Sequence, residues 1–113
     1  MHVKSFAATA TGAVIASMLC FANTAYAQAD AGQNALYVKS LAATCANCHG
    51  TNGKAIEGSS VVTIAGLDRA YFISQMTAFK TGARPATIMH QLSKGYSDAQ
   101  IETLATYFAA LKK

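Results

Sequence analysis

The segment that most constrains this chain is a five-residue motif, Cys-Ala-Asn-Cys-His, at residues 45–49. Its two cysteines, Cys45 and Cys48, are three residues apart, so on one helical turn their thiols lie on the same side. That spacing lets each thiol form a thioether to one vinyl group of a haem, and the adjacent His49 can bind the iron as the proximal ligand. The motif predicts one covalently attached haem c, held by Cys45 and Cys48, with His49 as an iron ligand.

The first 27 residues have the pattern of a secretory signal peptide. Lys4 supplies a positive charge, residues 6–21 form an uncharged apolar stretch, and Ala25-Tyr26-Ala27 is a small-residue cleavage site. A transmembrane anchor is the alternative, but the apolar stretch is short for a membrane span and a cleavage site follows it. We therefore expect a cleaved signal at residues 1–27, one domain at residues 28–113, export to the periplasm, and no membrane segment after cleavage.

The size and charge of the chain limit its function. It has 113 residues with nine Lys and Arg against five Asp and Glu, and Lys4 would leave with the signal. The basic residues are scattered, which argues against a nucleic-acid partner. The mild positive charge suits an acidic redox partner, although an ordinary solvated surface explains it equally well. A domain this short buries a thin core, and a covalently held haem would stabilise it.

The apolar pattern predicts an all-α domain, with three longer helices and a short one around the haem. Asp68 is a suitable N-cap for the second longer helix, Gly82 and Pro85 end it, and Ser97 with Gln100 forms a capping box before the last. Tyr71, Phe72, Met76 and Phe79 form the expected apolar face of the second helix, and Ile101, Leu104, Tyr107, Phe108 and Leu111 that of the last. The expected segments are a tail at 28–33, a helix at 35–46, a loop at 50–65, helices starting after Asp68 and Ser97, and a short helix or loop at 87–92.

Three residues are candidates for the second axial ligand of the iron: Met76, Met89 and His90. Met76 belongs to an apolar stripe at helical spacing, which is typical of a core methionine. Met89 lies in a loop region well after the haem motif, from which it can reach the open face of the haem. His90 is expected to be a surface histidine, because neighbouring side chains point in different directions. We therefore predict His49/Met89 ligation, which leaves no open iron position and favours electron transfer over catalysis at the haem.

Other functions of the same motif are possible. A thiol–disulfide protein could use Cys45 and Cys48, but the βαβ pattern expected around such a motif is absent and His49 would have no role. A structural zinc site could use Cys45, Cys48, His49 and His90, with a spacing unlike the usual two-cysteine, two-histidine pattern. A peroxidase-like haem protein would need an open or displaceable sixth ligand.

With these features in place, residues 31–111 resemble a class I cytochrome c. More narrowly, the chain is similar to the cytochrome subunit of flavocytochrome c sulfide dehydrogenase. That resemblance implies that Cys45 and Cys48 hold the haem, that His49 and Met89 bind the iron, and that the electrons come from a flavoprotein subunit that oxidises sulfide. A freely diffusing shuttle to a terminal oxidase or reductase is the alternative. The segments that carry the narrower resemblance are residues 45–53, 63–67, 71–72, 84–89 and 94–98.

Three departures from that family are visible. The chain has one haem motif, whereas the family's subunit often has two. The loop at residues 50–65 contains no proline, whereas class I cytochromes usually have one there whose carbonyl orients the proximal histidine. We therefore expect another carbonyl of this loop to accept the Nδ1–H bond of His49. His90 follows Met89 where the family has glycine, and it could affect solvent access or the pH dependence of the potential.

Overall fold

The computed structural model describes the backbone of residues 10–113 and the side chains from residue 30 onward. The predicted signal at residues 1–27 therefore lies partly outside the described residues. The described chain contains helices and no strand: α1 (Ala10–His49), α2 (Arg69–Thr81), α3 (Met89–Leu92) and α4 (Asp98–Ala109). Short 3-10 turns, η1 (Thr51–Gly53) and η2 (Ser93–Gly95), follow α1 and α3. The all-α prediction is confirmed.

The chain divides into two units, one up to Leu36 and one formed by Tyr37–Lys113. All residues of the haem motif, and both candidate methionine ligands, belong to the second unit. None of the helices between residues 10 and 113 is both long enough and apolar enough to cross a membrane.

The helix α1 is longer than predicted, because the expected tail at 28–33 is also helical. Its C-terminal end is where the sequence indicates, directly after His49. Gly50 adopts a positive φ of 78°, and a Cβ there would lie 2.0 Å from the Lys54 carbonyl oxygen. Only glycine fits this tight turn, so the helix ends at the last residue of the haem motif.

Capping residues set the bounds of α2 as predicted. The Asp68 carboxylate accepts a hydrogen bond from the Tyr71 backbone N–H at 2.9 Å, and Gly82 ends the helix in the left-handed conformation. The buried face consists of Phe72 and Met76. The prediction that Tyr71 belongs to this face is wrong, because its side chain is 49% exposed. A phenol at the edge of an apolar stripe keeps its hydroxyl in water at little cost.

The predicted capping box begins α4. The Ser97 hydroxyl accepts from the Gln100 backbone N–H at 3.2 Å, and the Gln100 side chain accepts from the Ser97 backbone N–H at 2.9 Å. Ile101, Leu104 and Phe108 of this helix are buried, as expected, whereas Tyr107 only packs against the edge of the core. Leu111, predicted for the same helical face, lies beyond the end of α4 and also packs against the edge of the core.

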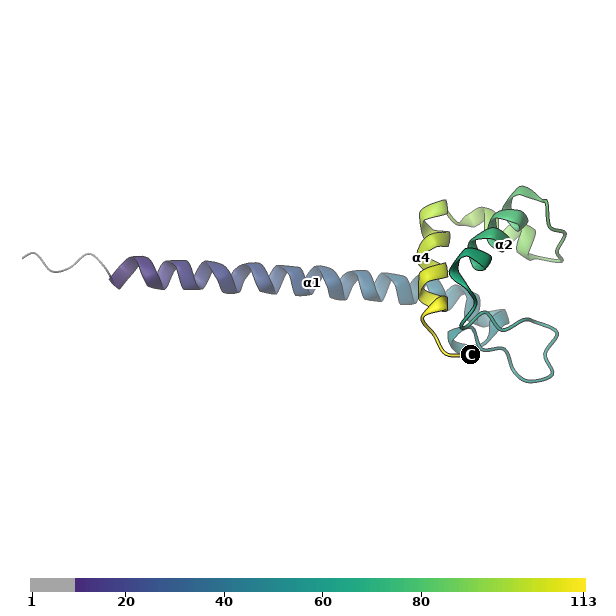
Figure 1. Ribbon diagram of the computed structural model, residues 1–113, viewed down its shortest axis with the longest axis horizontal. Coiled ribbons are helices and arrows are strands. Elements are labelled where there is room, and N and C mark those ends of the chain that lie inside the picture. Colours follow the sequence, from purple (N-terminus) through teal and green to yellow (C-terminus); the bar gives the residue numbers. More distant parts are fainter. Residues whose placement is uncertain (1–9) are drawn as a thin grey trace, which may run out of the picture. The chain divides into compact units, whose positions relative to one another are not determined.

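The core of the second unit lies mainly between α2 and α4. Figure 1 shows α2 in green beside α4 in yellow, and the Phe72 and Phe108 rings stack with their centroids 5.8 Å apart. Ala42 of α1 and Ile64 of the loop complete the buried cluster. The segments that carry the candidate ligands are arranged around this core.

Candidate functional site

His49, the last residue of α1, is held by a single hydrogen bond from its ring. Its Nδ1 lies 2.7 Å from the carbonyl oxygen of Val62. A carbonyl oxygen can only accept, so Nδ1 carries a proton, and in the neutral imidazole Nε2 then keeps a free lone pair. This is the tautomer that a metal-binding histidine needs, and the carbonyl also fixes the orientation of the ring.

The loop after α1 brings the Val62 carbonyl to this position without a proline. The carbonyl of Gly53 accepts from the backbone N–H groups of Ile64 and Ala65, at 2.8 and 3.0 Å. Gly53 is buried, and a Cβ on it would come within 2.6 Å of Ile64 and 2.8 Å of Phe108. The close approach folds the loop back beside the end of α1. The expectation that a loop carbonyl replaces the missing proline is confirmed, and that carbonyl belongs to Val62.

Cys45 and Cys48 lie one turn apart near the end of α1 and are not joined in a disulfide. Cys45 is half-buried and Cys48 is exposed. Burial raises the pKa of the Cys45 thiol, and hydrogen bonds with Thr44 and Tyr96 oppose that rise. A redox-active cysteine needs a lowered pKa, so this environment argues against the thiol–disulfide alternative.

The two methionines differ in their surroundings. Met76 is 6% exposed and lies inside the buried cluster, as expected for a core residue. Met89 is the first residue of α3, is half-buried, and packs against the edge of the same cluster that Cys45 contacts. Of the two sulfur atoms, only that of Met89 belongs to a side chain outside the buried core.

His90, predicted to be a surface histidine, is half-buried. Its Nδ1 is buried and has no hydrogen-bond partner among the described residues. The short helix α3 packs against α2, and its next two residues, Gln91 and Leu92, are exposed. No group of three or more His, Cys, Asp or Glu side chains within the described residues could hold a metal ion, so the zinc alternative has no support there.

The residues near the motif fit a haem. The available donors are a histidine nitrogen with the correct tautomer, two free thiols and a thioether sulfur, which are the ligand types of c-type haems. Apolar side chains border these donors on the same segments: Val62, beside His49, is 65% exposed and Ile88, beside Met89, is 53% exposed. Such surface suits a large apolar ring.

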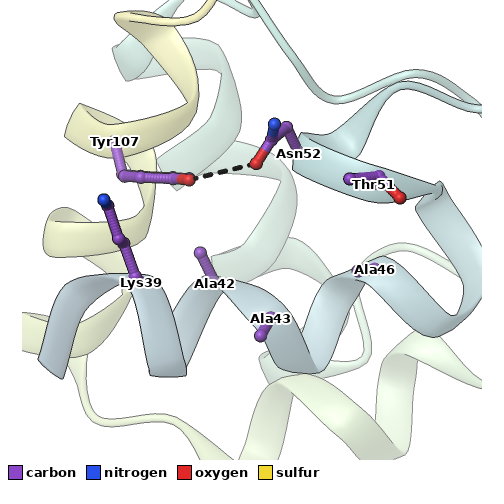
Figure 2. Close-up of a pocket in the computed structure, with 7 residues that line it drawn as sticks. All are labelled: Lys39, Ala42, Ala43, Ala46, Thr51, Asn52 and Tyr107. Atoms are coloured by element: carbon purple, nitrogen blue, oxygen red, sulfur yellow. Dashed lines mark hydrogen bonds between the residues drawn. The ribbon is translucent and has the colours of Figure 1, made fainter. Parts of the chain in front are cut away.

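A cavity of about 290 Å³ lies on this unit, beside α1. Figure 2 shows Lys39, Ala42 and Ala43 of α1 at one side of it and Tyr107, whose hydroxyl donates to the Asn52 side-chain oxygen at 3.4 Å, at the other. None of the predicted haem-binding residues lines it. Ala46 of the motif and Thr51 of the following turn do line it, so the cavity borders the motif without reaching its predicted ligands.

Comparison with known proteins places the chain in a family. No family model matches it. It is 38% identical to cytochrome c-553 of Helicobacter pylori over 77 residues, which are 66% of this chain and 78% of that protein. In structure it is similar to cytochrome c4 of Acidithiobacillus ferrooxidans, with a TM-score of 0.56 and 34% identity over 59% of this chain and 38% of the other. The chain belongs to the class I cytochrome c family, whose members carry electrons and are not enzymes.

Within that family, relatives from sulfur metabolism stand out. The chain is 37% identical over 73 residues to the cytochrome subunit of sulfide dehydrogenase from Chlorobaculum tepidum, covering 65% of this chain and 64% of that one. It is 38% identical over 71 residues to a thiosulfate dehydrogenase electron acceptor from Thiomonas intermedia, covering 63% of this chain and 33% of that one. The chain thus spans just under two thirds of the first relative and a third of the second.

Sequence reasoning did not find three contributors to the site: the Val62 carbonyl, Thr44 and Tyr96. A backbone acceptor has no side-chain signature, so nothing in the sequence could single out Val62. Tyr96 stands in the Lys94-Gly-Tyr segment that resembles the sulfide dehydrogenase subunit. The position of Tyr96 in the sequence does not indicate that its hydroxyl contacts Thr44 of α1.

Proposed function

We propose that this chain carries single electrons through one haem c, attached at Cys45 and Cys48 and ligated by His49 and Met89. The observation that carries the proposal is the 2.7 Å contact between His49 Nδ1 and the Val62 carbonyl oxygen. This contact leaves Nε2 available to bind iron, on a histidine that directly follows a pair of correctly spaced cysteines.

Each residue has a defined role in this proposal. The Cys45 and Cys48 sulfurs would hold the haem covalently, His49 Nε2 would bind the iron, and the Met89 sulfur would fill the remaining axial position. The haem supplies the Fe(III)/Fe(II) couple. A thioether ligand favours the ferrous state and raises the reduction potential relative to bis-histidine ligation. With both His49 and Met89 bound, the iron would have no position left for a substrate, which favours electron transfer.

For the electron donor, we favour a flavoprotein that oxidises sulfide. The similarity to the cytochrome subunit of sulfide dehydrogenase supports this choice, and the similarity to a thiosulfate dehydrogenase electron acceptor also points to inorganic sulfur compounds. The alternative is a freely diffusing shuttle to a terminal oxidase or reductase. Either role fits the predicted export to the periplasm with cleavage after Ala27.

The test is gentle affinity purification of the tagged protein from its native cells, followed by an absorbance spectrum and intact masses. We expect a mass equal to residues 28–113 plus one haem and the tag. A stoichiometric flavin-containing partner, whose sulfide oxidation reduces the haem, supports the sulfide dehydrogenase role. A lone haem protein supports the diffusing shuttle. A chain of the mass of the bare polypeptide, with two free thiols, would contradict haem attachment altogether.

A further inference from the structure

The phenol of Tyr96 connects two segments that the proposed haem site requires. Tyr96 directly follows η2, seven residues after Met89, and its hydroxyl lies 2.7 Å from the hydroxyl of Thr44. Thr44 belongs to α1 and immediately precedes Cys45. The contact therefore joins the segment of the proposed sixth ligand to the helix of the cysteines.

The direction of this hydrogen bond follows from counting hydrogens. The Thr44 hydroxyl donates its one hydrogen to the backbone carbonyl of Leu41, at 2.7 Å. It can therefore only accept from Tyr96, whose phenol is the donor. The result is a short chain of hydrogen bonds from the Tyr96 phenol through Thr44 to the backbone of α1.

The backbone of Tyr96 is also held in place. The half-buried ammonium of Lys80, on α2, donates to the Tyr96 carbonyl at 2.9 Å and to the Asp98 carboxylate at 2.8 Å. The Tyr96 backbone N–H donates to the Ser93 carbonyl at 3.3 Å. The ring packs against the edge of the buried cluster, as do Cys45 and Met89. The backbone that carries the Tyr96 phenol is thus held by hydrogen bonds on both sides of the residue.

Helical hydrogen bonds connect Tyr96 to Met89 without a break. The N–H groups of Gln91 and Leu92 donate to the Ile88 carbonyl, and that of Ser93 donates to the Met89 carbonyl. The next bond, from Tyr96 to Ser93, closes η2. These bonds link residues 88–96 into one hydrogen-bonded segment. Movement of Met89 away from the haem moves the segment and strains the bond that Tyr96 makes with α1.

We infer that Tyr96 is a positioning residue for the sixth iron ligand. Its hydrogen bond to Thr44 fastens the Met89 segment to the helix of the cysteines and so keeps the Met89 sulfur on the iron. The inference rests on the proposed His49/Met89 ligation. The inference concerns local opening of residues 88–96. When Met89 leaves the iron, an added ligand of the ferric haem can bind in its place, so the affinity for that ligand reports the opening.

The test is titration of the ferric holoprotein with imidazole, followed through loss of the far-red thioether–iron band. Tyr96→Phe removes the hydroxyl and keeps the ring. We expect its apparent affinity for imidazole to rise about fivefold, the change that corresponds to ~1 kcal/mol for one net hydrogen bond. Tyr71→Phe is the matched control, because the Tyr71 hydroxyl has no hydrogen-bond partner among the described residues, and its affinity should equal that of the wild type.

Thr44→Val is an independent variant, in case Tyr96→Phe does not accumulate as holoprotein. It should give a similar increase, and the double variant should exceed neither single variant by much, because both remove the same bond. A purely structural role for Tyr96 would lower the urea midpoint of unfolding and leave imidazole affinity at the wild-type value, and that result would overturn the inference. A wild-type protein without the far-red band would instead overturn the Met89 ligation itself.

Discussion

The imidazole of His49 depends on a residue 13 positions away in the sequence. The motif explains why a histidine follows Cys48, but Nε2 is left free because the Nδ1–H group donates to the Val62 carbonyl. Gly50 makes this possible, because the turn that it forms directs the chain back beside α1.

Replacement of the two methionines separates ligand from core residue. Met89→Ala should abolish the far-red band of the oxidised protein and lower the reduction potential, because the thioether that favours ferrous iron is lost. Met76→Ala should keep the band and lower the free energy of unfolding by about 2–5 kcal/mol, as expected for a buried methionine. Absorbance and urea unfolding measure the two effects. The assignment of Met89 is wrong if only Met76→Ala removes the band.

At the scale of helices, the ends were the most predictable features. Asp68, Gly82 and the pair Ser97 and Gln100 act locally, through hydrogen bonds to the nearest turn or through a backbone conformation that glycine adopts freely. The buried faces of the helices were less predictable than their ends. Tyr71 fits the helical period of the α2 stripe, yet the position of α4 decides which part of that stripe is covered.

The capping box gives a prediction at this scale. Ser97→Ala removes the acceptor of the Gln100 backbone N–H and should lower the free energy of unfolding by ~1 kcal/mol. Ser74→Ala, the same substitution at an exposed position inside α2, should leave stability unchanged or raise it slightly, because alanine is the better helix former. Urea unfolding of both variants measures the difference, and equal midpoints would contradict the capping role.

For the molecule as a whole, the small core is the governing feature. Within the described residues, nine apolar residues are buried, and three of them are alanines: Ala42, Ala65 and Ala105. Such a core buries little area per residue, so a domain of this size needs additional stabilisation. A covalently bound haem would provide it, since a bound group adds its binding free energy to the folded state.

Removal of the attachment sites tests this view. A chain with Cys45→Ala and Cys48→Ala should lose cooperative thermal unfolding and most of its helical circular dichroism at room temperature. Alanine has high helix propensity, so the substitutions themselves do not disfavour α1. The wild-type holoprotein is the reference, with its helical signal followed on heating. A haem-free variant that melts at the wild-type temperature would show that the protein part is stable by itself.

The sequence alone determined what local chemistry encodes: the helical class, the ends of α2 and α4, and the residues able to bind a haem. Cys45, Cys48 and His49 are neighbours along the chain, so their spacing is sufficient to define the motif. The tertiary structure decided which groups from distant segments meet them. The Val62 carbonyl beside His49 and the Tyr96 phenol beside Thr44 depend on how the loop and the Met89 segment pack around α2 and α4. Packing of that kind arises from the whole core, and no single motif specifies it.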